Sequence, residues 1–278
     1  MGSELIETTW RIGDTIEKRW EVHRILVGGM GIAYLVYDNE TQQPLAVKTF
    51  REDALAQQPD LAERFWNEAR AWIELDRHQN VTRAHFIQDV RGRPLLFLEY
   101  VSGGDLSRWI GSPRLSEDPR RVLSFAIQFC DGMIHATGKG IKAHRDIKPE
   151  NCLIAEDNVL KITDFGLAKA FDSVRRIGPR SYTVAGPAVS QTGFGAGTPT
   201  HMSPEQFDDV KHVDIRSDIY SFGVMLFQMV TGKLPFVGST VQELEHLHKR
   251  NAPPHLPRSS DVRVDVYSGP RNSDQAIS

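Results

Sequence analysis

The sequence predicts a two-lobed α+β fold, with a β-rich lobe over residues 20–100 and a helical lobe over residues 101–251. Runs of β-forming residues dominate the first of these stretches. Apolar residues at helical spacing dominate the second. The length of 278 residues fits one large domain or two lobes. Residues 1–19 are then an N-terminal extension, and residues 252–278, which follow no apolar period, are predicted to be a flexible tail.

The β-rich half contains five predicted strands and one helix. The strands cover residues 19–27, 32–37, 45–50, 86–90 and 95–100. Between the third and the fourth, Asp60 is placed to cap a helix, with Glu63 three residues later. Leu61, Phe65 and Trp72 then share one apolar side of that helix. The expected result is a small sheet that carries one helix.

The other half contains two long predicted helices. Val122, Phe125, Ala126, Phe129 and Met133 repeat at i, i+3, i+4, i+7 and i+11, which is helical spacing. Residues 219–230 are apolar on nearly every side, as expected of a helix buried in a core. Short strands are predicted at 152–154 and 159–162, and the stretch 170–204 is too long to be a simple connector.

The composition is that of an ordinary globular protein. Hydrophobic residues make up 40% and charged residues 25% of the chain, which excludes disordered and collagen-like classes. The net charge of −3 gives no reason to expect a nucleic-acid partner. Two cysteines, Cys130 and Cys152, cannot build a disulfide framework, and no apolar run reaches the roughly 20 residues that span a bilayer. We therefore expect a cytoplasmic protein without a membrane segment.

Two motifs in the β-rich half point to an anionic ligand. Gly28, Gly29 and Gly31 lie between two predicted strands, where glycines let a hairpin approach a phosphate closely. Lys48 lies inside an apolar strand, where an unpaired ammonium group is costly. Glu68, on the apolar side of the following helix, is the candidate partner.

The helical half adds a denser set of chemical groups. The run His144-Arg145-Asp146-Ile147-Lys148-Pro149-Glu150-Asn151 places an acid, a cation and an amide in one loop, and Asp164-Phe165-Gly166 follows. Ser203-Pro204-Glu205 and the run from Asp218 to Gly223 come next. In this order the motifs resemble those of the eukaryotic-type (Hanks-type) protein kinases, over roughly residues 20–250. The glycine loop and the Ser-Pro-Glu-Gln run are most similar to bacterial serine/threonine protein kinases.

The resemblance implies a kinase fold, ATP and Mg²⁺ (or Mn²⁺) as cofactors, and a role for each matching residue. Lys48, oriented by Glu68, would hold the α- and β-phosphates, and Asn151 and Asp164 would coordinate the metal. Asp146 would accept the proton of the substrate hydroxyl. Lys148 would contact the γ-phosphate, and Thr198 would bridge Asp146 and Lys148. Trp72, Phe165 and His144 would form a stacked column. The implied nucleotide contacts are Gly28, Gly29, Gly31, Ala33, Ala46, Glu99, Val101, Asp105 and Leu153.

The resemblance also implies the substrate class and a form of regulation. Lys148 stands two residues after Asp146, as in serine/threonine kinases, so the expected partners are proteins with Ser or Thr acceptors. The activation segment covers residues 164–205. A phosphate there would pair with Arg145 and order residues 170–196. Autophosphorylation in trans, with self-association of two copies, would supply that phosphate.

Three departures from the family keep a second reading open. Either Leu26 occupies the place of a glycine in the loop or the loop is one residue shorter, and Ala33 occupies the place of a valine over the adenine. The helical lobe is expected to lack its last helices, and with them the arginine that pairs with the glutamate matching Glu205. Arg258, Arg263 and Arg271 are the candidate substitutes, although none lies in a recognisable context. The alternative to an active kinase is therefore a kinase-fold pseudoenzyme, or a regulatory binding module with an incomplete C-lobe.

Overall fold

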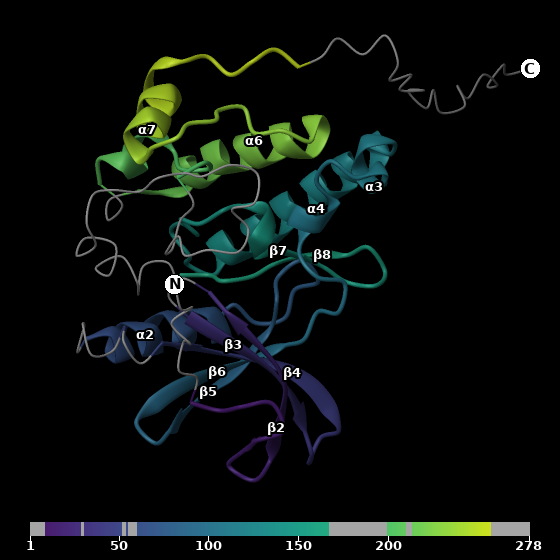
Figure 1. Ribbon diagram of the computed structural model, residues 1–278, viewed down its shortest axis with the longest axis vertical. Helices are drawn as coiled ribbons and strands as arrows, with labels where there is room; N and C mark the ends of the chain where they lie inside the picture. Colours follow the sequence, from purple (N-terminus) through teal and green to yellow (C-terminus); the bar gives the residue numbers. More distant parts are fainter. Residues whose placement is uncertain are drawn as a thin grey trace, which may run out of the picture.

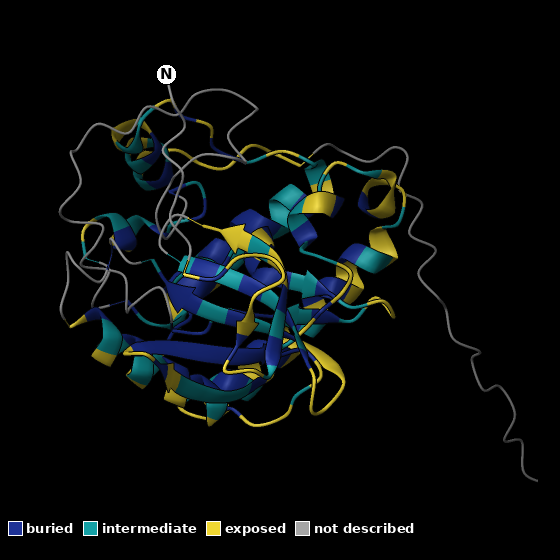
Figure 2. Cartoon of the chain, turned by 60° about the horizontal axis from the view of Figure 1, so that its bottom comes forward, coloured by how far each residue is buried: buried dark blue, intermediate teal, exposed yellow. Residues whose placement is uncertain are grey.

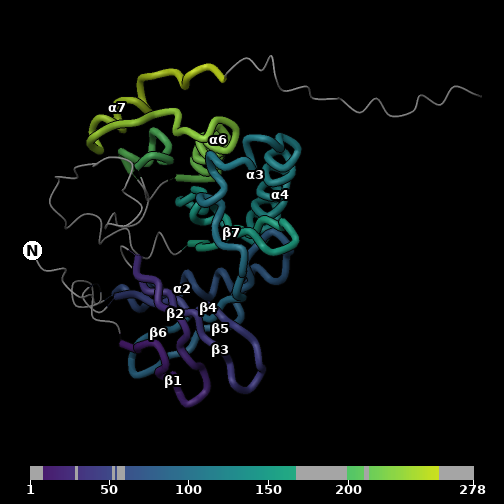
Figure 3. Tube along the Cα trace, turned by 45° about the vertical axis from the view of Figure 1, so that its right-hand side comes forward, coloured from purple at the N-terminus to yellow at the C-terminus, as the bar shows by residue number. Residues whose placement is uncertain are grey.

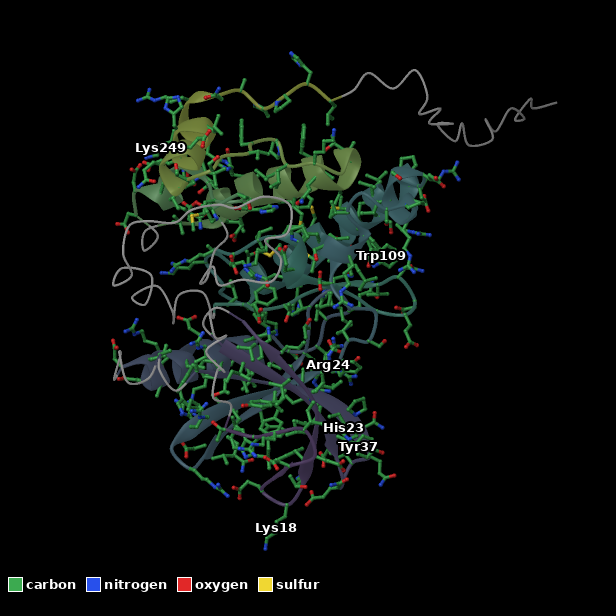
Figure 4. All side chains as sticks on the ribbon, viewed as in Figure 1. Lys18, His23, Arg24, Tyr37, Trp109 and Lys249 are labelled. Atoms are coloured by element: carbon green, nitrogen blue, oxygen red, sulfur yellow. The ribbon has the colours of Figure 1, made fainter. Side chains whose placement is uncertain are left out.

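The chain folds into a sheet-containing half and a helical half, which lie one above the other (Figure 1). The computed structural model describes residues 9–28, 31–51, 54, 60–166, 199–209 and 213–256, and the statements below concern these residues. Lys18 lies at the free end of the sheet half, and Lys249 lies at the opposite end of the molecule (Figure 4). The predicted α+β architecture with two lobes is confirmed. The predicted domain boundaries stay a prediction, and most of the expected flexible tail lies outside the described residues.

Six strands form the sheet, in the order β1-β2-β3-β4-β6-β5 with antiparallel neighbours. They are β1 (Thr15–Ile16), β2 (Trp20–Val27), β3 (Gly31–Asp38), β4 (Gln43–Phe50), β5 (Ala84–Val90) and β6 (Arg93–Glu99). The five predicted strands are thus confirmed, each within a few residues. The sixth, β1, was not predicted, because two residues are too few to show an alternating pattern.

Helix α2 (Leu61–Ile73) covers one face of the sheet beside β5 and β6. Its buried residues are Leu61, Phe65, Ala69 and Trp72, at the spacing of a single helical side. The predicted cap at Asp60 is wrong, because Asp60 has helical φ and ψ of −86° and −1° and its side chain accepts no capping hydrogen bond. The Asp60 carboxylate instead pairs with Arg64, one turn further along the helix.

The opposite face of the sheet is covered by the N-terminal segment. Trp10 packs edge-on against Tyr34 of β3, with ring centroids 5.5 Å apart. Ile16 is fully buried in the same cluster, together with Trp20 and Phe97. Residues 10–16 of the predicted N-terminal extension therefore contribute to the core of the sheet half. Figure 2 colours each residue by its burial and shows buried residues in the strands of the sheet.

The helical half is built around α4 (Pro119–Gly138) and α6 (Ile215–Thr231), which stack through Phe129 and Phe222 at a centroid distance of 4.4 Å. Its other elements are η1 (Leu106–Trp109), α3 (Pro113–Ser116), η2 (Pro149–Asn151), β7 (Cys152–Ile154), β8 (Leu160–Ile162), η5 (Pro204–Phe207) and α7 (Val241–Arg250). None of the helices in the described part of the chain is long and apolar enough to cross a membrane.

Helix α6 is not buried on every side, so that sequence expectation is wrong. Its buried side carries Ser217, Asp218, Ser221, Val224, Met225 and Met229. Ile219 is 63% exposed and Val230 is 48% exposed, because no described element packs over that side. The apolar residues at these positions face solvent in the part of the chain that the structure describes.

Glu205 was expected to lack a partner, and the structure supplies one. The Ser217 hydroxyl, in the first turn of α6, donates a hydrogen bond to the Glu205 carboxylate. Burial alone would raise the pKa of Glu205, but hydrogen bonds from Ser217 and from its own backbone outweigh burial and lower it. A neutral hydroxyl thus stabilises this carboxylate within the described residues.

Backbone hydrogen bonds hold the chain together at the crossover and between the loop after α2 and β8, and Figure 3 shows the two halves from a second side. At the chain crossover, Ile154 donates its N–H to the carbonyl of Gly104 at 2.8 Å, and Asp105 forms a β-bridge with Leu153. Behind it, the loop after α2 pairs with β8: Thr82 donates to the Ile162 carbonyl at 2.8 Å and Ile162 donates to the Asn80 carbonyl at 2.9 Å.

We expect Gly103→Ala to lower the free energy of unfolding by about 1–3 kcal/mol, the range for overpacking. A Cβ at residue 103 would overlap the carbonyl oxygen of Ile154, so the crossover and β7 would have to separate. Gly138→Ala is the matched control, because a Cβ there meets nothing within 4 Å. Urea unfolding gives the free energy of unfolding of both variants. Equal changes in the two variants would show that the crossover accommodates a Cβ at residue 103 without strain.

Candidate active site

Lys48 and Asp164 meet at the interface between the two halves. Lys48 lies on β4, and its ammonium forms an ion pair with the carboxylate of Asp164, which follows β8. The two side chains are about three-quarters buried, being 25% and 24% exposed. Asp164 has a left-handed φ of +70°, which is uncommon for a residue other than glycine. The fold thus brings together two predicted site residues that are far apart in sequence.

Glu68 of α2 lies next to the same turn. A Cβ on Gly166, two residues after Asp164, would collide with the Glu68 carboxylate, and Gly166 has a φ of +72°. Both facts require glycine at position 166. Lys48 pairs with Asp164 in the described part of the chain, and the predicted contact between Glu68 and Lys48 stays a prediction.

A second cluster surrounds Asp146. The ammonium of Lys148 lies 3.0 Å from the Asp146 carboxylate, and both side chains are 14% exposed. Asn151 donates its amide N–H to the carboxylate at 2.9 Å and to the backbone carbonyl of Asp146 at 2.7 Å. Burial would lower the pKa of Lys148, but the neighbouring Asp146 carboxylate raises it, so the lysine stays charged. The three predicted residues therefore form one hydrogen-bonded group.

Asp218 of α6 holds the backbone just before Asp146. Its carboxylate accepts the N–H of His144 at 2.7 Å and that of Arg145 at 2.8 Å. Gln206 also donates to the Arg145 carbonyl at 3.0 Å, and Arg145 has a left-handed φ of +71°. Burial raises the pKa of Asp218, which is only 2% exposed. Sequence reasoning matched Asp218 to a motif but gave it no role, although a carboxylate in an apolar helix was an available signal.

Three aromatic rings connect the clusters. The ring of Phe165 lies 4.9 Å from that of His144 and 6.1 Å from that of Trp72, between centroids. His144 also bonds the Thr163 carbonyl through Nε2 at 2.8 Å. The predicted column of rings is thus confirmed, and it links α2 to the loop that carries Asp146.

One face of the sheet borders the Lys48 site. In the strand register Ala33 pairs with Lys48, and Ala46 pairs with Leu98, so Ala33 and Ala46 lie on the same face as Lys48. Leu98 is buried at the end of this row. Leu153, from the helical half, pairs with Asp105 across the crossover. These positions fit an apolar ring held between the two halves.

The hairpin predicted to cover the phosphates closes despite its missing glycine. Gly28 donates its N–H to the Gly31 carbonyl at 2.9 Å, and the strand pairing continues up to Val27 and Ile32. Leu26, which occupies the place of that glycine, pairs with Ala33 on the outer part of the hairpin. Of the remaining predicted site residues, Gly29 and Thr198 lie outside the described residues. Val101 is buried in the crossover.

Two buried histidines flank the site. His201 contacts Thr200 through Nδ1 at 3.0 Å and Gln228 through Nε2 at 3.1 Å. His248 of α7 contacts the hydroxyl of Tyr220 through Nδ1 at 2.8 Å. Burial lowers the pKa of both rings to about 4, so both are neutral in the folded protein near pH 7.

We expect the free energy of unfolding to fall as the pH drops from about 6.5 to about 4. The unfolded chain protonates these rings near pH 6.5 and the folded chain does not, so the unfolded state binds more protons in this window. Each ring contributes a slope of up to about 1.4 kcal/mol per pH unit. Urea unfolding should show a shallower pH dependence for His201→Gln and His248→Gln. His23→Gln, at an exposed position, should leave the slope unchanged.

This two-lobed fold, with Lys48, Asp164 and Asp146 between its lobes, is the architecture of a protein kinase. The chain belongs to the family described as "Protein kinase domain", whose model matches residues 21–273. It is similar to three bacterial proteins named as serine/threonine-protein kinases. They are pkn3 of Myxococcus xanthus (33% identity over 264 residues), Pkn1 of the same organism (35% over 239 residues) and PknB of Mycolicibacterium smegmatis (32% over 257 residues).

These matches cover most of this chain and a smaller part of each relative. They include 93%, 84% and 90% of the present sequence, but 46%, 32% and 39% of the relatives. The chain therefore spans less than half the length of these relatives.

Proposed function

We propose that this chain is an ATP-dependent serine/threonine protein kinase, which transfers the γ-phosphate of ATP to hydroxyl groups of protein substrates. The observation that carries the proposal is the convergence of the Lys48–Asp164 pair with the Asp146, Lys148 and Asn151 cluster between the two lobes. The family and the names of the similar proteins support the same reaction. A cytoplasmic location and the absence of a nucleic-acid partner stay predictions.

Asp146 and Lys148 are placed for the transfer step. The Asp146 carboxylate accepts the proton of the substrate hydroxyl, and Asn151 and Lys148 fix its orientation. Lys148 remains cationic beside it and attracts the γ-phosphate. Because phosphoryl transfer has a loose transition state, positioning and charge stabilisation supply most of the catalysis.

Lys48, oriented by Glu68, binds the α- and β-phosphates, and Asn151 and Asp164 hold Mg²⁺, or Mn²⁺ in its place. The donor set fits a hard cation, since the Asn151 amide donates its N–H to Asp146 and leaves its oxygen for a ligand. The backbones of Asn151 and Thr163, which precedes Asp164, are bonded at 3.0 Å. When bound, the metal neutralises phosphate charge. Thr198 is proposed to bridge Asp146 and Lys148. The proposed nucleotide contacts are Gly28, Gly29, Gly31, Ala33, Ala46, Glu99, Val101, Asp105 and Leu153.

Regulation by autophosphorylation extends the proposal. A phosphate in the activation segment (residues 164–205) pairs with Arg145, whose backbone is fixed by Asp218 and Gln206. The acceptor residues, in 170–196, lie outside the described residues. Two copies of the chain associate for transfer in trans. Mass spectrometry before and after phosphatase treatment, paired with rate measurements, tests this step, and full activity without any phosphate there contradicts it.

Incubation of the purified chain with labelled ATP, Mg²⁺ and a generic basic protein tests the main proposal. The expected result is label on Ser or Thr of the acceptor, and its dependence on Asp146 identifies the site. Nucleotide binding without transfer, even after preincubation with ATP, would instead support a pseudoenzyme or binding module. The intact residues around Asp146 and Asp164 weigh against that alternative.

A further inference from the structure

A polar cavity lies where the loop after α2, the end of β6 and strand β8 meet. Its volume is about 250 Å³, and its lining residues are Arg77, His78, Gln79, Arg83, Glu99 and Lys161. The first four belong to the loop between α2 and β5, Glu99 ends β6, and Lys161 lies on β8. Both halves of the molecule therefore contribute to the cavity. Glu99 is a proposed nucleotide contact through its backbone, and no other lining residue has a role in the proposed transfer reaction.

The cavity has an excess of positive charge. Three of its side chains are cations, and its only carboxylate is Glu99. That carboxylate accepts the N–H of Arg83 at 2.8 Å and lies 3.0 Å from the Lys161 ammonium. Within the described part of the chain, the guanidinium groups of Arg77 and Arg83 have no ion pair. With His78 neutral, the three cations and the one carboxylate give the lining a net charge of about +2.

Two histidines beside the cavity respond to this field. Burial lowers the pKa of His78, and the nearby His135 and Lys161 lower it further, against the opposing effect of Asp131. The His78 and His135 rings stack at 4.6 Å. Burial also lowers the pKa of His85, and Arg83 and Arg77 add to that effect, against Glu99. The cations of the cavity thus add to the effect of burial at both histidines.

We propose that this cavity binds a phosphoryl oxyanion, held by Arg77 and Arg83 from the sheet half and by Lys161 from the helical half. The planar guanidinium fork donates two parallel hydrogen bonds to phosphate oxygens, which makes arginine suited to this ligand. A cavity of about 250 Å³ exceeds the roughly 30 Å³ of a water molecule several times, but falls below the 300–1,000 Å³ of pockets for larger organic ligands. The size therefore fits one phosphoryl group with its waters.

The phosphoryl group has two conceivable sources with the same chemistry, a phosphorylated protein segment and a free phosphate-bearing metabolite. In either case the ligand connects Arg83, which precedes β5, to Lys161, three residues before Asp164. It would share Lys161 with Glu99. The site does not depend on the proposed catalytic function, since no catalytic side chain lines it.

Titration of the full chain with inorganic phosphate, at constant ionic strength, tests the proposal. The Kd is taken from the amide NMR signals of residues 77–83 and Lys161, so binding elsewhere does not contribute. We expect Arg77→Gln/Arg83→Gln to weaken binding at least tenfold. The matched control is Arg91→Gln/Arg120→Gln, which removes the same charge at exposed positions and should leave the Kd unchanged. Arg120 lies about 22 Å along α4 from His135.

Equal Kd values in the two double variants, or no shift of these signals in the unaltered chain, would overturn the proposal. If the arginine variant loses its folded NMR spectrum, Lys161→Met takes its place, with the same tenfold weakening expected and an unchanged Kd overturning the site. A phosphoserine peptide, its unphosphorylated form and inorganic phosphate are then compared. A lower Kd for the phosphoserine peptide than for both the unphosphorylated peptide and inorganic phosphate identifies a protein source. Equal Kd values for the phosphoserine peptide and inorganic phosphate identify a free metabolite.

Discussion

Asp146→Asn should reduce the rate of phosphoryl transfer by about 10² to 10⁴-fold, the usual contribution of a general base. The amide oxygen of asparagine still accepts a hydrogen bond from Asn151, but it cannot take up a proton from the substrate hydroxyl. The variant also loses the negative charge that orients Lys148 at 3.0 Å. Nucleotide affinity should change little, because Asp146 is proposed to face the acceptor rather than the nucleotide.

Initial rates with labelled ATP and nucleotide binding, measured on the same preparation, separate these effects. Asp157→Asn is the control, since Asp157 lies at the exposed turn between β7 and β8 and bonds only locally to Val159. Near-normal turnover of Asp146→Asn would show that this carboxylate does not accept the proton. A parallel loss of nucleotide binding would show that it holds the nucleotide instead.

Asp218→Asn should lower the free energy of unfolding by about 2–4 kcal/mol. The carboxylate accepts two backbone N–H groups, whereas an asparagine presents one carbonyl oxygen and one NH₂ group to the same pair. One buried N–H is then left without an acceptor, which costs about 1–3 kcal/mol, and the charge-assisted bond at the other is weakened. For a chain of this size the melting temperature should fall by roughly 4–16 °C.

The catalytic loop should also lose its fixed position in this variant, so the transfer rate should fall beyond what the remaining folded fraction explains. Asp131→Asn serves as the control, because it makes the same change of residue type at an exposed position on α4. Thermal unfolding and initial rates, both at a temperature where the variant is folded, provide the comparison. If the free energy of unfolding falls by less than about 0.5 kcal/mol, as for an ordinary surface substitution, Asp218 does not anchor the catalytic loop.

The sequence predicts the strands and helices well because each has a local pattern of buried and exposed residues. Alternation in β3 and β4, and the i, i+4 spacing in α2, follow from one buried face on each element. The residues of the site belong to short motifs whose order is specific to one family. The contacts between those motifs, such as the pair of Lys48 with Asp164, depend on how the halves meet, and no local pattern contains that information.

The wrong predictions share a physical cause, which is competition between partners. Asp60 has a capping residue type, but Arg64 lies within reach of its carboxylate and its backbone is already helical. Glu205 was expected to need an arginine partner, whereas in the structure the hydroxyl of Ser217 donates a hydrogen bond to its carboxylate. The exposed residues of α6 were expected to be buried because they are apolar. Hydrophobicity indicates that a side chain tends to be buried, but it does not identify the element that packs against it.

The loop after α2 gives that helix the mechanics of a lever. Trp72 donates its ring N–H to the Thr82 carbonyl at 2.9 Å, and His135 of α4 contacts the Leu75 carbonyl at 2.6 Å, so the C-terminal end of α2 is fastened to the helical half. This end is the fulcrum, and Leu61 lies about 18 Å from it at 1.5 Å per residue. Tilting the helix by 10° would carry Leu61 by about 3 Å, while Glu68, nearer the fulcrum, would move by about 1 Å. A small rotation of the sheet would therefore move Glu68, the residue proposed to orient Lys48, much less than it moves the far end of the helix.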